Sequence, residues 1–150
     1  MKFEIPPTLK VEHEELHGIL RKATKEPGDV GDSAKALAEL MHPHFIKEEE
    51  YALPPLGLLH KLAQGKVTPD MKEVLSLTDK LKAELSQMLG EHMLIVTALE
   101  KLSLAAKKAE KMEYVKFAEA LTRHAQTEEE VSYPAAILIG EYVRVKLGLT

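Results

Sequence analysis

The sequence predicts an all-α protein: an up-down-up-down four-helix bundle with a short extra helix between its second and third long helices and a short C-terminal helix. Apolar residues recur at intervals of three and four along most of the chain, which is the helical period and differs from the period of two expected of strands. Clusters of Gly, Pro, Asp and Ser interrupt this pattern at only a few places. Short connections join the first two long helices and the last two, so consecutive helices should lie antiparallel.

The first two long helices have clear boundary signals. The first is predicted over residues 8–25, with Thr8 as its N-cap directly after a proline. A Glu-Pro-Gly-Asp turn at 26–29 ends it. The second begins at residue 32 or 33 and runs through residue 51. The prolines at 54 and 55 then stop it, because proline lacks the amide hydrogen of a helical residue and clashes with the preceding turn.

The middle of the chain contains the extra helix and the longest one. A short helical piece is predicted over 56–64 and is closed by Gly65. Thr68-Pro69 offers an N-cap followed by proline at the first helical position. The third long helix extends from there to about Lys108, with a break expected near Thr78.

The turn into the fourth helix contains neither Gly nor Pro, and we place it at 107–110 by symmetry with the first hairpin. The fourth helix then runs to about Ser132, and Pro134 opens the short terminal helix. We expect residues 1–150 to form one domain, because this length is usual for a single core.

The composition limits the classes of function. Charged residues make up 29% and hydrophobic residues 45% of the 150 residues, as in ordinary globular proteins. The net charge is −4 and no basic cluster stands out, which argues against nucleic-acid binding. Without cysteine, any metal must be held by nitrogen and oxygen. The chain shows neither a signal peptide nor an apolar stretch of roughly 20 residues, so we expect a cytoplasmic protein that does not associate with membranes.

Two long helices have the same unusual pattern on their inward faces. Each places a histidine and a glutamate within an otherwise apolar stripe of helical spacing: Leu37, Met41, His44, Glu48 and Tyr51 on the second helix, and Phe117, Leu121, His124, Glu128 and Val131 on the fourth. The longer motif His-x3-Glu-Glu-Glu-x3-Pro occurs at 44–54 and again at 124–134. The two hairpins therefore form an internal repeat.

The first and third helices each add one inward histidine directly after a glutamate, at Glu12-His13 and Glu91-His92. The two histidines of each hairpin are equally far from their turn, so we expect them at one height, facing each other across that hairpin. Two buried carboxylates without partners would cost several kcal/mol each, and no Lys or Arg lies on these stripes. A metal would supply the missing positive charge. The predicted ligands are His13, His44, Glu48, His92, His124 and Glu128.

The remaining polar residues near these stripes are weaker candidates. We expect five of them at the surface: Glu49, Glu50, His60, Glu129 and Glu130. His17 and His42 flank the stripes, and His17 is the best spare ligand. Tyr51 lies one turn beyond Glu48 and could bond a glutamate or a bound oxygen species, although a core tyrosine is the commoner case.

The ligand types suit iron, manganese or zinc and do not by themselves choose among them. The ordered pattern His, His-x3-Glu, His, His-x3-Glu on four bundle helices resembles the hemerythrin-like family, the HHE cation-binding domains, over nearly the whole chain. The resemblance implies a non-heme centre of two iron ions joined by an oxo or hydroxo bridge. It further implies that His13 and His44 bind one iron, that His92 and His124 bind the other, and that both glutamates bridge them.

One departure from the family bears on function. Its oxygen-carrying members have a second histidine one turn after the third-helix ligand, where this chain has Val96, so one iron should keep an open position. We therefore expect a protein that binds, senses or reacts with dioxygen, peroxide or nitric oxide. The second hypothesis is a di-iron oxidoreductase of peroxidase, catalase or iron-centre repair type. The third is a zinc-bound or metal-free interaction module, whose apolar segment at 137–145 forms a homodimer or only caps the bundle.

Overall fold

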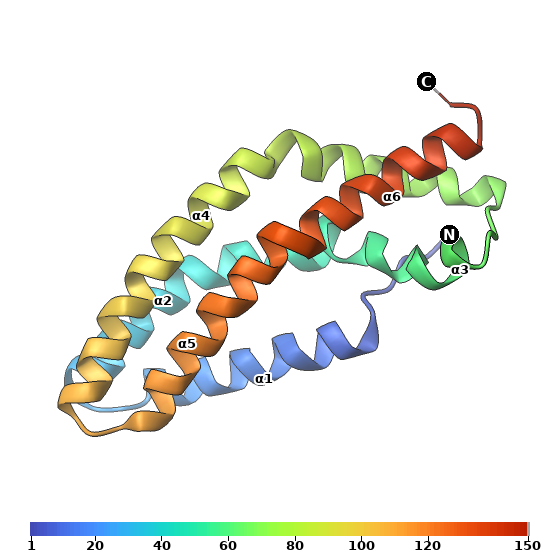
Figure 1. Ribbon diagram of the computed structural model, residues 1–150. Helices are drawn as coiled ribbons and strands as arrows, with labels where there is room; N and C mark the ends of the chain where they lie inside the picture. The colour runs from blue at the N-terminus through green and yellow to red at the C-terminus, as the bar shows by residue number, and fades with distance from the viewer. Residues whose placement is uncertain (150) are drawn as a thin grey trace.

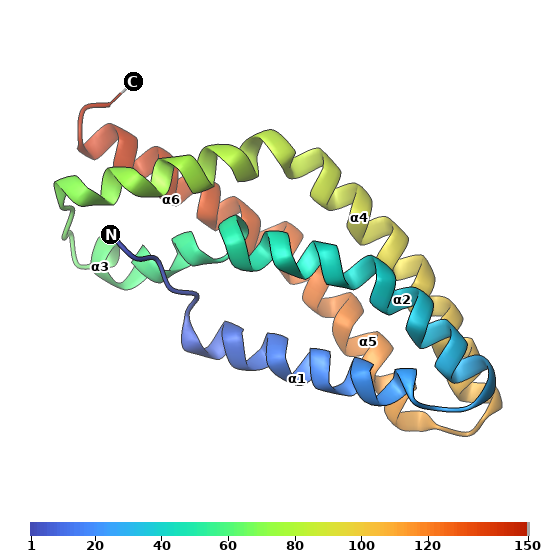
Figure 2. The same cartoon turned by 180° about the vertical axis from the view of Figure 1, so that it is seen from behind.

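The computed structural model describes residues 1–149, and within them every regular element is helical, so the all-α prediction is confirmed (Figure 1). The long helices are α1 (Pro7–Thr24), α2 (Gly28–Lys47), α4 (Leu75–Lys108) and α5 (Met112–Thr127). Around the bundle, α1 packs on α2, α2 on α4, α4 on α5, and α5 back on α1. Both hairpin turns lie at one end, and the two chain termini lie toward the other (Figures 1 and 2).

Two predicted helix starts need correction. Helix α1 begins at Pro7 with Pro6 as its N-cap, so Thr8 is not the cap. Proline suits the first helical position, because its fixed φ is helical and its missing amide hydrogen has no partner there anyway. Helix α2 begins at Gly28, earlier than the predicted 32 or 33, and Gly28 has a left-handed φ of 67°, which glycine adopts without strain.

The second long helix does not end at Lys47 but changes its winding there. Residues Glu48–Ala52 form the π-helical turn η1, followed by a 3-10 turn η2 (Pro54–Leu58) and the short helix α3 (Leu59–Ala63). The extra helix predicted over 56–64 is therefore part 3-10 and part α. Helix α5 likewise passes into a π-helical turn, η4 (Glu128–Ser132), which leads directly into α6 (Tyr133–Lys146). The terminal helix is thus a continuation of the fourth (Figure 1).

The predicted break near Thr78 is wrong. A 3-10 turn η3 (Pro69–Val74) precedes α4, which then runs without interruption from Leu75 to Lys108. Thr78 is buried in the contact between α4 and α6, where a Cβ on Gly140 would lie 2.1 Å from the threonine Oγ1. The polar residue therefore marks a close helix crossing. The turn after Lys108 includes Glu110, which has a left-handed φ of 57° although it is not glycine.

The apolar core has two parts, one on each side of a buried polar layer. One cluster of α1, α2, α4 and α5 residues fills the end with the hairpin turns. The other is built from η1, η2, η3, α4 and α6 and fills the opposite end. Five of the six predicted metal ligands are buried between the clusters, and the side chain of the sixth, His124, is 8% exposed.

Candidate metal centre

The fold brings all six predicted ligands together. Every long helix contributes one histidine, and each of the two glutamates is the first residue of a π-helical turn, at Glu48 and Glu128. Both carboxylates are nearly inaccessible, with exposures of 1% and 3%. A histidine and a glutamate four residues later face the same side of a helix, so each repeat delivers both groups to one point.

The imidazole Nε2 atoms meet in two pairs. His13 Nε2 lies 3.0 Å from His124 Nε2, and His92 Nε2 lies 2.9 Å from His44 Nε2. The contacts at the imidazole tips therefore run between hairpins. The two histidines of one hairpin were expected to face each other, and this expectation is wrong. The contacts also differ from the pairing that the resemblance implied, in which His13 and His44 share one iron and His92 and His124 share the other. The tips meet between hairpins because α1 also packs on α5 and α2 on α4.

Glu128 lies between the two pairs. Its Oε2 is 3.1 Å from His124 Nε2 and 3.4 Å from His13 Nε2, and its Oε1 is 3.4 Å from His92 Nε2. The resulting groups of possible metal ligands are His13, His124 and Glu128, and His44, His92 and Glu128. Glu48 Oε1 lies 3.3 Å from His44 Nε2 and adds a second carboxylate to the latter group. One shared carboxylate thus links two ligand groups.

Carboxylates hold the outer nitrogens of three histidines. Glu91 Oε1 accepts from His44 Nδ1 over 2.8 Å, Glu12 Oε1 from His124 Nδ1 over 2.6 Å, and Glu129 Oε1 from His92 Nδ1 over 3.1 Å. Such partners fix the tautomer of a metal-binding imidazole and leave its Nε2 lone pair free for the ion. Glu129 is exposed, as expected, and it also contacts His92.

The His44 and His92 pair fits a cation. Both Nδ1 atoms face carboxylates and so carry the hydrogen, which leaves two Nε2 lone pairs 2.9 Å apart. They can stay that close only if a proton or a metal ion lies between them. Burial lowers the pKa of His44, although contact with Glu91 partly offsets this effect, so a bound proton is disfavoured. The donor set is therefore suited to a metal ion.

The pKa values of the two buried carboxyl groups shift in opposite directions. Burial and the neighbouring charge of Glu128 raise the pKa of Glu48 well above 4.5. Burial alone would raise the pKa of Glu128 too, but its contacts with Glu48 and with three imidazoles hold that pKa well below 4.5. Within residues 1–149, no Lys or Arg lines the central cavity of about 10 Å³, and Glu128 Oε2 has no hydrogen-bond donor. Positive charge is therefore what the centre lacks.

Tyr133 is the residue that the sequence reasoning missed. Its hydroxyl donates to Glu48 Oε2 over 3.0 Å and lies 3.2 Å from His92 Nε2 and 3.3 Å from His44 Nε2. Tyr51, the predicted candidate, is buried but donates to Glu84 instead and also contacts the Met88 sulfur at 3.7 Å. Tyr133 sits five residues after Glu128, the spacing that brings residues to one face of a π-helical turn.

The other flanking residues occupy different places. His17 stacks on Phe45 with ring centroids 3.4 Å apart, and burial together with the nearby His13 lowers its pKa to about 4. It does not line the central cavity, whereas Phe45 does. His42 is exposed, as are Glu49, Glu50, Glu130 and His60. Val96 is half-buried and lines a pocket of about 340 Å³ that reaches His92.

The family of the chain follows from a comparison with protein-family models. The Hemerythrin HHE cation binding domain matches residues 5–136, so the chain belongs to this family, and the resemblance read from the histidine and glutamate pattern is confirmed. Comparisons with curated proteins and with solved structures give no significant match. Within residues 1–149, no helix is both long and apolar enough to cross a membrane.

Proposed function

We propose that this HHE domain holds two iron ions and uses them to bind, sense or react with dioxygen, peroxide or nitric oxide. The observation that carries the proposal is the buried convergence of four imidazole Nε2 atoms and two carboxylates with no cationic side chain among them. The ions would be held by the six predicted ligands: His13, His44, Glu48, His92, His124 and Glu128. When bound, iron would supply the redox chemistry and the open coordination position for a small molecule.

The chain's own residues have defined tasks at such a centre. Glu12, Glu91 and Glu129 orient three imidazoles through their Nδ1 atoms. The Tyr133 hydroxyl donates to Glu48 and lies within 3.3 Å of two imidazoles, so it can also hold a proton beside a small bound molecule. The apolar clusters cover this layer toward both ends of the bundle.

The two sides of the centre differ in the side chains that surround it. The internal repeat aligns Phe45 with Ala125, and His17 with Val96. Phe45 and His17 stack on each other beside His13, whereas the smaller Ala125 and Val96 line the pocket that reaches His92. A central cavity of about 10 Å³ has no room for an organic substrate. This supports a diatomic or similarly small ligand.

The oxidoreductase hypothesis stays as the second candidate, and the position of Tyr133 favours it, because a hydroxyl beside the ligands can hold a proton during turnover. The interaction-module hypothesis depends on the exposed apolar residues of α6. A cytoplasmic location also stays a prediction.

The direct test is reconstitution of the chain with ferrous iron under anaerobic conditions. We expect two irons per chain and new near-ultraviolet absorption bands after exposure to air. His124→Ala should lose iron, whereas His60→Ala, which changes an exposed histidine outside the bundle, should match the wild type. One zinc ion or no metal per chain would refute the di-iron proposal. Steady peroxide consumption by the wild type that His124→Ala abolishes would establish the oxidoreductase.

A further inference from the structure

His13 lacks the carboxylate contact at Nδ1 that the other three histidines of the centre have. His13 is 3% exposed, and its Nδ1 is buried without a hydrogen-bond partner. An imidazole whose Nδ1 is unpaired is free to change its tautomer and its orientation. The side chain that should pair with it can be deduced from the internal repeat.

The carboxylate contacts follow the repeat. The glutamate that precedes the histidine on the first helix of each hairpin reaches into the other hairpin: Glu91 contacts His44, and Glu12 contacts His124. The residue after the buried glutamate of α5–η4, Glu129, contacts His92 within its own hairpin. Because His44-x3-Glu48-Glu49 repeats as His124-x3-Glu128-Glu129, the counterpart of this last contact would join Glu49 to His13.

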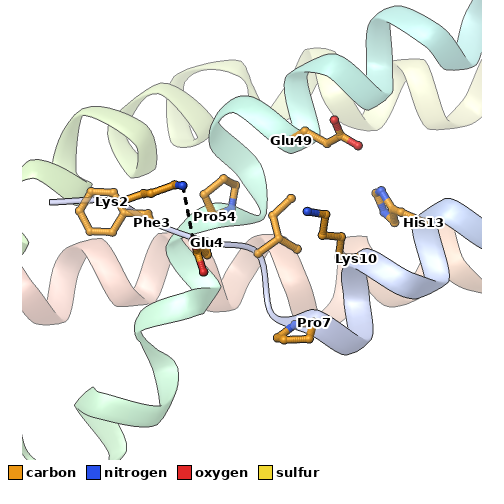
Figure 3. A pocket seen from close by; sticks show the side chains of 9 residues that line it. Lys2, Phe3, Glu4, Pro7, Lys10, His13, Glu49 and Pro54 are labelled. Carbon is orange, nitrogen blue, oxygen red and sulfur yellow. Dashed lines mark ion pairs between the residues drawn. The ribbon is translucent and has the colours of Figure 1, made fainter.

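Glu49 is placed to make that contact. It is exposed, and it lines a pocket of about 490 Å³ together with Lys10 and His13. Figure 3 shows the Glu49 side chain, the Lys10 side chain and the His13 ring around this pocket, with Glu49 coming from the turn after α2 and the other two from α1. An exposed glutamate side chain is flexible, so a change of rotamer costs little and needs no movement of the bundle.

We infer that Glu49 is the positioning residue of His13: its carboxylate accepts from His13 Nδ1 and holds the His13 Nε2 lone pair toward the metal. This inference rests on the proposed function, because it concerns the metal-loaded protein. It gives all four imidazoles a carboxylate partner. It also distinguishes Glu49 from the adjacent Glu50, which is exposed as well but has no assigned contact with the centre.

The test compares Glu49→Gln with Glu50→Gln as the matched control and Glu129→Gln as the counterpart in the other hairpin. Each protein is loaded with ferrous iron, and the rate of iron transfer to an excess of chelator is measured. Loss of a carboxylate beside a metal-binding histidine typically weakens binding by about 10- to 100-fold. We therefore expect one of the two irons to leave at least about tenfold faster in Glu49→Gln and in Glu129→Gln, and at the wild-type rate in Glu50→Gln.

Two further measurements distinguish positioning from a structural effect. The thermal midpoint of the metal-free protein should be the same in Glu49→Gln and Glu50→Gln, because both side chains are exposed. Glu49→Asp should restore part of the iron retention, because it keeps the charge. If the wild type holds two irons and Glu49→Gln retains them as well as Glu50→Gln does, the inference about Glu49 is wrong and the proposed function stands. A folded wild type that takes up no iron would overturn the proposed function and this inference together.

Discussion

The hydroxyl of Tyr133 donates a hydrogen bond to Glu48 Oε2 over 3.0 Å and joins the start of α6 to the start of η1. Both residues are buried, at 0% and 1% exposure. Burial and the nearby charges of Glu48 and Glu128 raise the pKa of Tyr133 far above its usual value, so the phenol keeps its proton. Tyr133 is therefore a permanent donor to one of the two central carboxyl groups.

Removing this donor should destabilise the metal-free protein. In Tyr133→Phe the Glu48 carboxyl group loses its hydrogen-bond donor inside the bundle, and leaving such a group unsatisfied costs about 1–3 kcal/mol. We expect the free energy of unfolding, measured by urea titration, to fall by about that amount.

The matched control is Tyr51→Phe, because Tyr51 is also buried but bonds Glu84 outside the centre. Iron loaded into Tyr51→Phe should show the wild-type optical spectrum, whereas Tyr133→Phe should change it. Equal unfolding free energies for Tyr133→Phe and the wild type would contradict the importance of the contact.

The helices could be predicted from the sequence because the apolar period and the Pro and Gly breaks are local signals. The turn placed at 107–110 by symmetry falls within two residues of the observed one, which ends α4 at Lys108 and starts α5 at Met112. The start of α2 at Gly28 was missed because glycine can act as a turn residue or as the first residue of a helix, and the sequence alone does not distinguish the two.

The six buried side chains could be predicted because each breaks an apolar stripe, but the residues beyond Glu128 could not. The prediction continued the α-helical period to Val131, which is 58% exposed. The π-helical turn adds a residue to the winding, so Ser132 and Tyr133 face the interior instead. The partners of the Nδ1 atoms were also missed, because Glu12 and Glu91 contact histidines on other helices. Contacts of that kind depend on how the hairpins pack.

Replacing Glu48 with glutamine should stabilise the metal-free protein at neutral pH. The folded-state pKa of Glu48 is raised above 4.5, so its contribution to stability is complete below pH 4.5 and is lost as the pH rises through the folded-state pKa. Glu48→Gln cannot ionise and lacks this loss. The variant's advantage in unfolding free energy should therefore grow as the pH is raised from 4.5, as measured by urea titrations across the range. The exposed Glu50→Gln serves as control and should follow the wild type at every pH.

The apolar face of α6 predicts self-association. Ile139 and Val143 are buried and cap the bundle, whereas Leu138 and Val145 are 68% and 76% exposed. We expect light scattering to show a dimer that Leu138→Glu converts to a monomer. Leu104→Glu changes a leucine on α4 that is 60% exposed and should leave the dimer intact. A monomeric wild type would show that α6 only caps the bundle.

Acidification should release the metal, because histidine ligands bind only when neutral and carboxylates bind best when ionised. Contacts with Glu128 and Glu12 outweigh burial and raise the pKa of His124, whereas burial lowers the pKa of His44. As the pH falls, a proton therefore competes for His124 before it competes for His44. We expect iron retained after gel filtration to fall in two steps and to be lost by about pH 4. Glu12→Gln removes the carboxylate that orients His124 through Nδ1, so the first step should occur at a higher pH than in the wild type. Full retention of both irons at pH 4 would contradict the proposed ligand set.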